Sequence, residues 1–330
     1  MSNPGGVCVF GAGRWGRNHV RVLAETGRLA AVVDPDPEAL AVARSLGVPV
    51  AARFDELDEP VRRRCVAAVI ATPAATHYDL ANRCLDRRLD ILVEKPLALS
   101  LGDAQKLAER AEREERIVMT GHILLFHPAV RALRELVVGG ELGDIRYVYS
   151  NRLNLGRVRR EENILWSFAP HDLAAMEFIL GVPPNRVRAD GGSWLQPGLV
   201  DVTVTHLGFP GGIQGHVFVS WLHPGKEHRL VVVGSRKMAV FDDLRPEARL
   251  LLHDVGIDED PAGALATRDD GQVVIALDEV EPLSAQCAHF LECIDSRQRP
   301  LTDTAHALSV LWVLEAAQRS LERQGEWIQS

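Results

Sequence analysis

Cysteine is scarce in this sequence and follows no pattern. The five cysteines are widely spaced and never form a Cys-x-x-Cys pair (Cys8, Cys65, Cys84, Cys287, Cys293). Such spacing offers neither a disulfide framework nor a zinc site, and it is typical of a reducing compartment. No apolar run reaches the ~18 residues that a membrane span needs, and residues 1–6 lack a charged segment followed by an apolar one. We therefore expect a cytoplasmic protein that holds no metal and contacts no membrane.

An excess of basic residues is also missing. The chain has 37 Lys and Arg against 45 Asp and Glu, a net charge of −8, so nucleic acid is not an expected partner. Hydrophobic residues make up 46% and charged residues 25%, as in ordinary globular proteins. Because single cores stop growing beyond ~250–300 residues, a chain of 330 residues predicts two domains.

A glycine-rich turn follows the first apolar segment. Residues 7–10 predict a buried strand and residues 17–25 a helix, and Gly11-Ala12-Gly13-Arg14-Trp15-Gly16 lies between them. In this setting Gly-x-Gly-x-x-Gly indicates dinucleotide binding. Gly11 allows the tight turn, Gly13 lets the backbone approach a diphosphate, and Gly16 lets the helix pack against the strand. We expect the whole turn, Arg14 and Trp15 included, to contact the cofactor.

An aspartate ends the second predicted strand, residues 29–33. Asp34 lies 23 residues after Gly11, where a carboxylate can accept hydrogen bonds from the adenosine ribose and repel a 2′-phosphate. The sequence therefore favours NAD over NADP. Asp34-Pro35-Asp36-Pro37 could instead only start the helix predicted over residues 38–46. Both roles are compatible, since Asp34 would bind the cofactor and Asp36 would cap the helix.

Strands and helices alternate through the first third of the chain. Further apolar segments at residues 66–71, 90–93 and 117–120 are separated by predicted helices, one of them over residues 101–115. This rhythm predicts an α/β fold with a doubly wound parallel sheet. Thr72 and Pro73 follow one strand at the ligand-binding edge and are expected to line the cofactor. His77 begins the next helix, either as a further cofactor contact or as a surface histidine.

The segment Val93-Glu94-Lys95-Pro96 closes another strand. Pro96 cannot continue a strand's hydrogen-bond ladder, so Lys95 is expected at the carboxyl end, where open α/β sheets bind ligands. A partly desolvated lysine there can act as a general acid or base. The alternative is that Glu94 and Lys95 form a solvated pair in a loop. Glu94 is also a candidate cofactor contact.

Two histidines and an aromatic residue follow the last strand of this domain. His122 is a candidate cofactor contact and Phe126 a candidate substrate contact. A structural role is an equal alternative for His122 and for His127. Their spacing shows no metal-binding geometry.

From residue 143 the pattern changes to long alternating strands. They are predicted at residues 144–155, 201–209, 213–222, 228–234 and 237–242. This predicts a mostly antiparallel open sheet, one face of which is free for a subunit contact that would make a homodimer or homotetramer. Apolar residues at helical spacing predict helices over residues 283–296 and 303–324. The expected division is a nucleotide-binding domain (1–121), an α+β substrate domain (122–302) and a C-terminal helix packing back on the first domain (303–330).

Candidate substrate contacts gather between residues 152 and 171. Pro170 suits the first turn of a helix, which would put His171 near the helix N-terminus, where the dipole lowers the pKa of a histidine. A neutral histidine can accept or relay a proton, with capping or core packing as the alternative. Basic residues form either a solvated face or a site for an anionic substrate group (Arg152, Arg157, Arg159, Arg160). The remaining candidates for substrate recognition are Asn154, Asn163, Trp166 and Ser167.

Together these features resemble the glucose-fructose oxidoreductase and inositol dehydrogenase family (Gfo/Idh/MocA). The resemblance rests on the glycine motif, the Thr72-Pro73 loop, Glu94-Lys95-Pro96 and the His171-Asp172 pair, and it covers nearly the whole chain. It implies that Lys95 and His171 flank the nicotinamide and serve the carbon that is oxidised or reduced. The block from 151 to 172 is similar to members from nucleotide-sugar pathways.

Two positions depart from the pattern of that family. Many members carry an aspartate four residues before the histidine, where this chain has Ser167, which cannot supply a fixed negative charge. Leu125 stands where sugar-nucleotide dehydrogenases of the family often carry arginine. The resemblance implies NAD-dependent hydride transfer at a secondary alcohol or ketone carbon of a sugar, with a nucleotide sugar as the leading candidate. Alternatives are a reductase of a non-sugar carbonyl or imine, a glycosidase that uses NAD, and a dinucleotide-binding regulator without catalysis.

Overall fold

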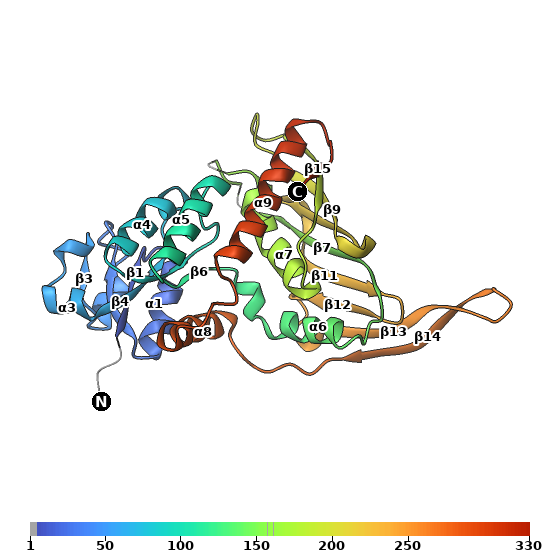
Figure 1. Ribbon diagram of the computed structural model, residues 1–330, viewed down its shortest axis with the longest axis horizontal. Helices are drawn as coiled ribbons and strands as arrows, with labels where there is room; N and C mark the ends of the chain where they lie inside the picture. Colours follow the sequence, from blue (N-terminus) through green and yellow to red (C-terminus); the bar gives the residue numbers. More distant parts are fainter. Residues whose placement is uncertain (1–4, 157, 161) are drawn as a thin grey trace. The chain divides into compact units, whose positions relative to one another are not determined.

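The structure, a computed structural model, describes residues 5–156, 158–160 and 162–330 and contains two units, each with its own sheet (Figure 1). One unit comprises the chain up to Ile123 together with Glu281–Leu311, and the other comprises Leu124–Val280 together with Trp312–Ser330. The first division therefore falls two residues after the expected position, 121. The segment that returns to the first unit begins at Glu281, well before the expected residue 303.

The first unit contains six parallel strands in the order β3-β2-β1-β4-β5-β6. The strands are β1 (Gly6–Phe10), β2 (Leu29–Val33), β3 (Val50–Ala51), β4 (Cys65–Ile70), β5 (Asp90–Val93) and β6 (Val118–Thr120). Its α-helices are α1 (Gly16–Glu25), α2 (Ala41–Ser45), α3 (Glu59–Arg64), α4 (His77–Asp86), α5 (Leu101–Arg113), α8 (Pro282–Ser296) and the first part of α9 (Thr304–Glu322). The strand order reverses between β1 and β4, which makes the sheet doubly wound and confirms the predicted fold class.

Continuous apolar sequences explain why these strands pair in parallel. Every residue of β1 and β5 is buried, as expected for strands covered by helices on both faces. α1 packs against α8, and α4 packs against α5. At the β6 edge the backbone N–H of Thr120 donates to the carbonyl of Thr302 at 2.8 Å, and the Thr302 hydroxyl donates to the Thr120 carbonyl at 2.7 Å. The returning segment thus completes the edge of the first sheet.

The second unit contains a nine-stranded sheet in the order β14-β13-β12-β11-β7-β10-β9-β8-β15. Neighbouring strands pair antiparallel, with β7 and β10 as the parallel exception. The strands are β7 (Ile145–Leu155), β8 (Arg186–Gly192), β9 (Val202–Gly208), β10 (Gln214–Ser220), β11 (Leu222–Gly234), β12 (Met238–Asp242), β13 (Leu250–Glu259), β14 (Leu265–Val274) and β15 (Ile328–Gln329). The mostly antiparallel sheet is confirmed, whereas the sequence pattern did not predict β8, β13, β14 or β15.

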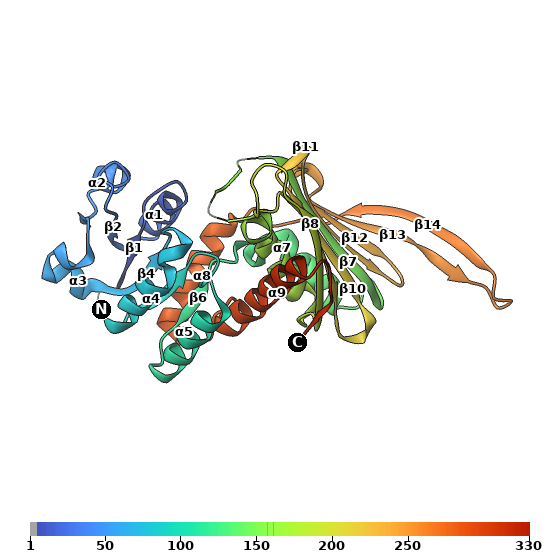
Figure 2. The same ribbon diagram turned by 90° about the horizontal axis from the view of Figure 1, so that it is seen from above.

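Helices cover one side of this sheet. The second unit contains α6 (Pro128–Val138), α7 (Ile164–Leu180) and the last part of α9, and α7 packs against β7, β9 and β10. Figure 2 shows α7 on one side of these strands. Figure 2 shows no helix of the described part of this unit on the opposite side. Tyr149 points to that side, because the next residue, Ser150, faces Asp172 of α7, and the Tyr149 ring stacks on its cross-strand partner His216 with centroids 5.1 Å apart. Tyr147 stacks on the same Tyr149 ring at 6.5 Å, so aromatic rings form a ladder across the open face. Short 3-10 helices also occur at Phe54–Glu56, Ala74–Thr76, Ile123–Phe126, Pro210–Gly212 and Pro246–Ala248.

The start of α7 corrects one prediction. The helix begins at Ile164, and Asn163 caps it, because the Asn163 carbonyl side chain accepts a hydrogen bond from the Trp166 backbone at 3.2 Å. Pro170 therefore lies inside the helix rather than in its first turn. The expectation that His171 sits at a helix N-terminus is wrong, because the helix already begins at Ile164.

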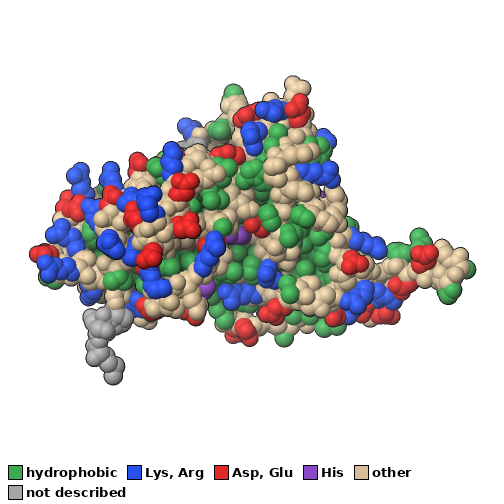
Figure 3. Space-filling model, in the orientation of Figure 1, with side chains coloured by type: hydrophobic (Ala, Val, Ile, Leu, Met, Phe, Trp, Pro, Cys, Tyr) green, Lys and Arg blue, Asp and Glu red, His purple; other side chains and the backbone are tan. Residues whose placement is uncertain are grey.

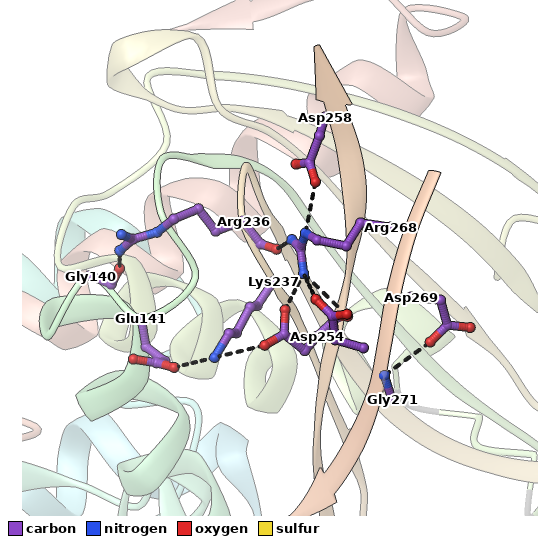
Figure 4. Close-up of polar contacts among 10 residues, drawn as sticks. Gly140, Glu141, Arg236, Lys237, Asp254, Asp258, Arg268, Asp269 and Gly271 are labelled. Carbon is purple, nitrogen blue, oxygen red and sulfur yellow. Dashed lines mark hydrogen bonds and ion pairs between the residues drawn. The ribbon is translucent and has the colours of Figure 1, made fainter. Parts of the chain in front are cut away.

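The β13–β14 hairpin is anchored to its neighbours by a charged cluster (Figure 4). Arg268 pairs with Asp254 and with Asp258, whose oxygen lies 3.0 Å from Arg268 Nε, and it donates to the carbonyl of Arg236 at 2.6 Å. Lys237 lies 3.2 Å from the other oxygen of Asp254 and 2.6 Å from Glu141. The alternation of charges therefore fixes the base of the hairpin, while its outer residues, such as Leu265, are exposed.

The surface of the first unit mixes charges of both signs. On the face shown in Figure 3, arginine and lysine side chains are interspersed with aspartate and glutamate. None of the helices in the described part of the chain is both long and apolar enough to cross a lipid bilayer.

Candidate functional site

The glycine-rich turn has the geometry that a dinucleotide needs. Gly11 has φ +86°, and a Cβ there would lie 2.7 Å from the carbonyl oxygen of Ala71. A Cβ on Gly16 would collide with the Gly11 carbonyl, so the approach of α1 to β1 depends on glycine. At Gly13 a Cβ would meet nothing within 4 Å, and Gly13 and the neighbouring Arg14 are exposed. The turn therefore leaves open space next to its backbone N–H groups, as diphosphate binding requires.

Asp34 is held next to this turn. Its Oδ2 accepts a hydrogen bond from the Ala12 backbone at 2.7 Å, and its Oδ1 accepts one from the Asp36 backbone at 2.8 Å. The carboxylate is thus fixed at the end of β2, in position to bind a ribose diol. Asp36 in turn accepts a hydrogen bond from the Glu38 backbone at 2.9 Å, ahead of α2.

Glu94 connects the end of β5 with the glycine-rich turn. Its Oε1 accepts hydrogen bonds from Trp15 Nε1 at 2.6 Å and from His19 Nε2 at 2.8 Å. Burial alone would raise the pKa of Glu94, but these two donors and the charge of Lys95 lower it, so the carboxylate is ionised at neutral pH. The next residue, Lys95, therefore follows a fixed anion. A role for His19 was not predicted, although its place on the buried side of an amphipathic helix was visible in the sequence.

His77 holds the same loop from the other side. It is buried, and its Nδ1 lies 2.7 Å from the carbonyl oxygen of Pro96, while Nε2 lies 2.9 Å from that of Thr72. The expectation of a surface histidine is wrong, because His77 bridges two loops at the carboxyl edge of the sheet. Thr72 also pairs its hydroxyl with Thr76 at 2.7 Å, and Pro73 precedes the short helix that leads to His77. The loop at Thr72 and the loop at Lys95 are thereby tied together.

His122 is buried in the first unit beside His306. The two rings form an edge-to-face pair with centroids 5.0 Å apart. Burial, together with the charges of His306 and Lys95, lowers the pKa of His122 well below its ordinary value, so the imidazole is neutral at neutral pH. Its Nδ1 has no hydrogen-bond partner among the described residues. A neutral ring nitrogen near Lys95 fits the predicted contact with a cofactor, which stays a prediction.

Arg152 is used inside the second unit. Its Nε lies 2.6 Å from Asp172 Oδ2 and its Nη2 lies 3.1 Å from Asp172 Oδ1, and the Ser150 hydroxyl donates to the same carboxylate at 2.6 Å. Burial alone would lower the pKa of Arg152, but the charge and hydrogen bonds of Asp172 raise it. This arginine thus anchors β7 to α7, in addition to any role with a substrate. The role of Asp172 was not predicted from the sequence.

The other predicted substrate contacts occupy varied surroundings. Asn163 is buried and donates to Gln318 Oε1 at 2.9 Å in addition to capping α7, so both ends of its amide are engaged. Arg159 is half exposed and pairs with Glu162 at 2.7 Å. Phe126 is buried with the guanidinium of Arg131 over its ring. Arg157 lies outside the described residues.

Three candidates lie on or near α7. Ser167 is buried and lies one helical turn before His171, so the two side chains share a face of the helix. Trp166 is partly exposed at the start of α7. On β7, the buried Oδ1 of Asn154 has no hydrogen-bond partner among the described residues, which leaves an acceptor for a polar ligand.

His127 has a structural role. Its Nδ1 accepts a hydrogen bond from the Ala129 backbone at 3.1 Å and so caps α6, while its Nε2 lies 3.5 Å from Asp243. Across the described part of the chain, no group of three or more His, Cys, Asp or Glu side chains could hold a metal ion.

Comparisons with known proteins cover both units. The family model described as "Oxidoreductase family, NAD-binding Rossmann fold" matches residues 6–122, and the "GFO/IDH/MocA C-terminal domain" matches residues 130–240. The chain is 27% identical to scyllo-inositol 2-dehydrogenase (NAD(+)) of Bacillus subtilis, over 94% of this chain and 92% of that protein. It is 31% identical to UDP-N-acetylglucosamine 3-dehydrogenase of Acidithiobacillus ferrooxidans, over 56% of each chain.

Solved structures show the same fold. The crystal structure of UDP-N-acetylglucosamine 3-dehydrogenase GnnA from Acidithiobacillus ferrooxidans matches with a TM-score of 0.83 and 24% identity, over 96% of this chain and 97% of that chain. GenD2 from gentamicin A biosynthesis, crystallised in complex with NAD, also matches with a TM-score of 0.83 and 24% identity, over 100% of this chain and 97% of that chain.

Proposed function

Because the chain belongs to the Gfo/Idh/MocA family of NAD-binding oxidoreductases, we propose that it transfers hydride between NAD and a secondary alcohol or ketone carbon of a sugar. The observation that carries the proposal is the position of Lys95. It lies at the carboxyl end of β5, between Glu94, which is bound to the glycine-rich turn, and Pro96, which is bound to His77. A lysine fixed at the ligand-binding edge of a doubly wound sheet suits acid/base work at a bound nicotinamide.

The candidate site residues of the first unit each have a role in the proposed hydride transfer. The backbone of the turn from Gly11 to Gly16 would bind the diphosphate, and Asp34 would bind the adenosine ribose. When bound, NAD supplies the hydride acceptor. Lys95 takes the proton from the substrate hydroxyl during oxidation and returns it during reduction. Thr72, Pro73 and His122 line the same edge of the sheet.

His171 is the proposed partner of Lys95. It holds or relays the proton that Lys95 exchanges, as the family resemblance implies. Ser167 shares the helical face of His171 without supplying a charge, so the orientation of this helix depends on other contacts, chiefly the Arg152–Asp172 pair. Asn154, Trp166 and Phe126 complete the proposed substrate contacts, together with Arg159 and Asn163.

We propose a nucleotide sugar as the substrate. Support comes from the 31% identity to a UDP-N-acetylglucosamine dehydrogenase and from the arginines near residue 159, which suit a diphosphate. A free polyol is the competing substrate, since a second relative is an inositol dehydrogenase. We further propose a cytoplasmic location, which the five free cysteines support. We also propose a homo-oligomer that associates through the open face of the second sheet, which the exposed aromatic ladder supports.

The test is turnover of a panel of nucleotide sugars, free sugars and inositols with NAD, followed at the absorbance band of the reduced nicotinamide. Lys95→Ala is expected to abolish turnover and to keep NAD affinity within about threefold of the wild type. Lys106→Ala is the matched control, because Lys106 is an exposed lysine of the same unit that pairs with Asp103. If Lys95→Ala turned over substrate like the wild type, the assignment of Lys95 would be wrong. Product formed without net change in absorbance would instead identify a glycosidase.

A further inference from the structure

His19 is a buried polar residue on the apolar side of α1. It has no exposed surface and shares that side with Val20 and Leu23. A buried imidazole costs free energy unless its ring nitrogens find partners. Both nitrogens of His19 have one, because Nε2 lies 2.8 Å from Glu94 Oε1 and Nδ1 lies 3.7 Å from Cys287 Sγ. One side chain thus connects α1, the end of β5 and α8.

Cys287 lies against the second ring nitrogen of His19. Burial, with the charges of Glu94 and Glu281, raises the pKa of the Cys287 thiol to about 12, so the thiol keeps its proton at neutral pH. A protonated thiol can donate to Nδ1 of His19, and Nε2 of His19 can then donate to Glu94.

Glu94 carries the effect of His19 to two parts of the site. The oxygen that accepts from His19 also accepts from Trp15, which belongs to the glycine-rich turn. The other oxygen, Oε2, packs against Gly121, because a Cβ added to Gly121 would lie only 2.8 Å from it. The Glu94 carboxylate therefore has little freedom to move on this side. A single carboxylate in a fixed position therefore links the turn to Lys95, the next residue.

We propose that His19 is a positioning residue that, through Glu94, holds Trp15 and Lys95 in one arrangement for cofactor binding and hydride transfer. The inference rests on the proposed function, because it assigns His19 a part in that reaction. A residue that only filled the core would be better replaced by leucine, which avoids burying an imidazole.

The experiment compares His19→Gln and His19→Leu with the wild type. Glutamine can place an amide N–H near the position of Nε2, whereas leucine fills space without donating. His19→Leu is expected to weaken NAD binding, measured by calorimetric titration, and to lower kcat by about 10- to 100-fold with a smaller change in the substrate KM. His19→Gln should recover most of both losses.

A matched control separates positioning from packing. Val22→Ala removes buried volume from α1 without touching Glu94. It should lower the midpoint of thermal unfolding and leave NAD affinity and kcat within about twofold of the wild type.

The pH dependence supplies a second readout. The groups that face Glu94 are His19 from α1, Trp15 from the glycine-rich turn and Lys95 on its own loop, with Cys287 behind His19. Without the His19 donor, burial raises the pKa of Glu94. NAD affinity of His19→Leu should then fall as the pH is lowered from 7 to about 5, while that of the wild type and of Val22→Ala stays level.

Three outcomes decide the matter. A folded His19→Leu variant with the kcat, NAD affinity and pH profile of the wild type overturns the proposal. If that variant does not fold, Trp15→Phe replaces it. This change removes the indole N–H, with the five-membered ring that carries it, at a side chain that is 43% exposed, and unchanged binding and turnover there overturn the link. If the wild type turns over nothing in the panel, the proposed function fails, and the NAD titrations alone decide the role of His19.

Discussion

Arg152 of β7 forms an ion pair with Asp172 of α7 through two guanidinium nitrogens, and both side chains are largely buried. The side chains are 14% and 4% exposed, and Ser150 donates a third hydrogen bond to the same carboxylate. Asp172 directly follows His171, so this ion pair holds the part of α7 that carries His171 against β7.

Removing the Asp172 carboxylate should destabilise the fold. Asp172→Ala leaves the Arg152 charge buried and unpaired, so we expect the free energy of unfolding to fall by about 3–5 kcal/mol, measured by urea denaturation. Asp190→Ala, which breaks the exposed pair with Arg188, should change it by less than about 0.5 kcal/mol. Equal losses in the two variants would show that the Arg152–Asp172 pair does not hold α7.

Asp34 should decide between the two nicotinamide dinucleotides. Asp34→Ser removes the negative charge that would repel a 2′-phosphate and weakens the hold on the ribose diol. We expect the ratio of NADP to NAD affinity to rise by about tenfold or more, measured by titration with each dinucleotide. Asp36→Ser is the control and should leave the ratio unchanged, because the Asp36 side chain accepts a hydrogen bond from the Glu38 backbone ahead of α2. An unchanged ratio in Asp34→Ser would remove Asp34 from the cofactor site.

Asp201 should give the fold a measurable dependence on pH. Burial alone would raise the pKa of Asp201, but hydrogen bonds from the Leu195 and Trp194 backbones and from the Trp221 indole lower it overall. A depressed carboxyl pKa stabilises the fold above the unfolded value of ~3.9, and this contribution is lost as the pH falls through the folded value. Asp201→Asn should therefore be less stable than the wild type at pH 7.

The comparison between the two proteins is made across pH. Unfolding by urea from pH 7 to about pH 3 should show the difference between wild type and Asp201→Asn shrinking below about pH 4. A difference that stayed constant over this range would mean that the charge of Asp201 does not contribute.

The open face of the second sheet should be the subunit contact. Tyr149→Asp puts a charge in the middle of the aromatic ladder, between Tyr147 and His216, and should convert the oligomer to monomers in light-scattering measurements. Leu99→Asp, at an exposed apolar side chain of the first unit, should leave the mass unchanged. A Tyr149→Asp variant that kept its oligomeric mass would place the contact elsewhere.

Local sequence was enough to predict five of the six strands of the first sheet, whereas β3 and the return of Glu281–Leu311 to this unit were not predicted. Gly11, Gly13 and Gly16 have a fixed relation to the strand and helix on either side, and Asp34 ends the next strand, so their positions follow from short-range pattern. The cysteine spacing, which is typical of a reducing compartment, and the continuous apolar strands agreed with this prediction. The fold class and the NAD-binding oxidoreductase family were therefore predictable without coordinates.

Long-range contacts could not be predicted in the same way. His19 and Glu94 are 75 residues apart, and no periodicity says that an imidazole on α1 will face the end of β5. Pro170 misled the prediction because prolines favour the first helical turn, while the Asn163 cap, which starts the helix earlier, competes with that preference. The β13–β14 hairpin was missed because its charged and exposed residues hide the alternation of a buried strand.

The contact between Thr120 and Thr302 has a consequence for biosynthesis. A ribosome releases β6 when more than half of the chain is still to be made, and the segment that covers its edge, together with α8 over α1, emerges almost last. The N-terminal part of the nascent chain therefore has an open edge at β6 and an uncovered α1 until the C-terminal segment has been synthesised. A truncation before Glu281 would therefore leave the N-terminal unit with an open strand edge and an uncovered helix, whereas the loss of Trp312–Ser330 alone would affect the second unit.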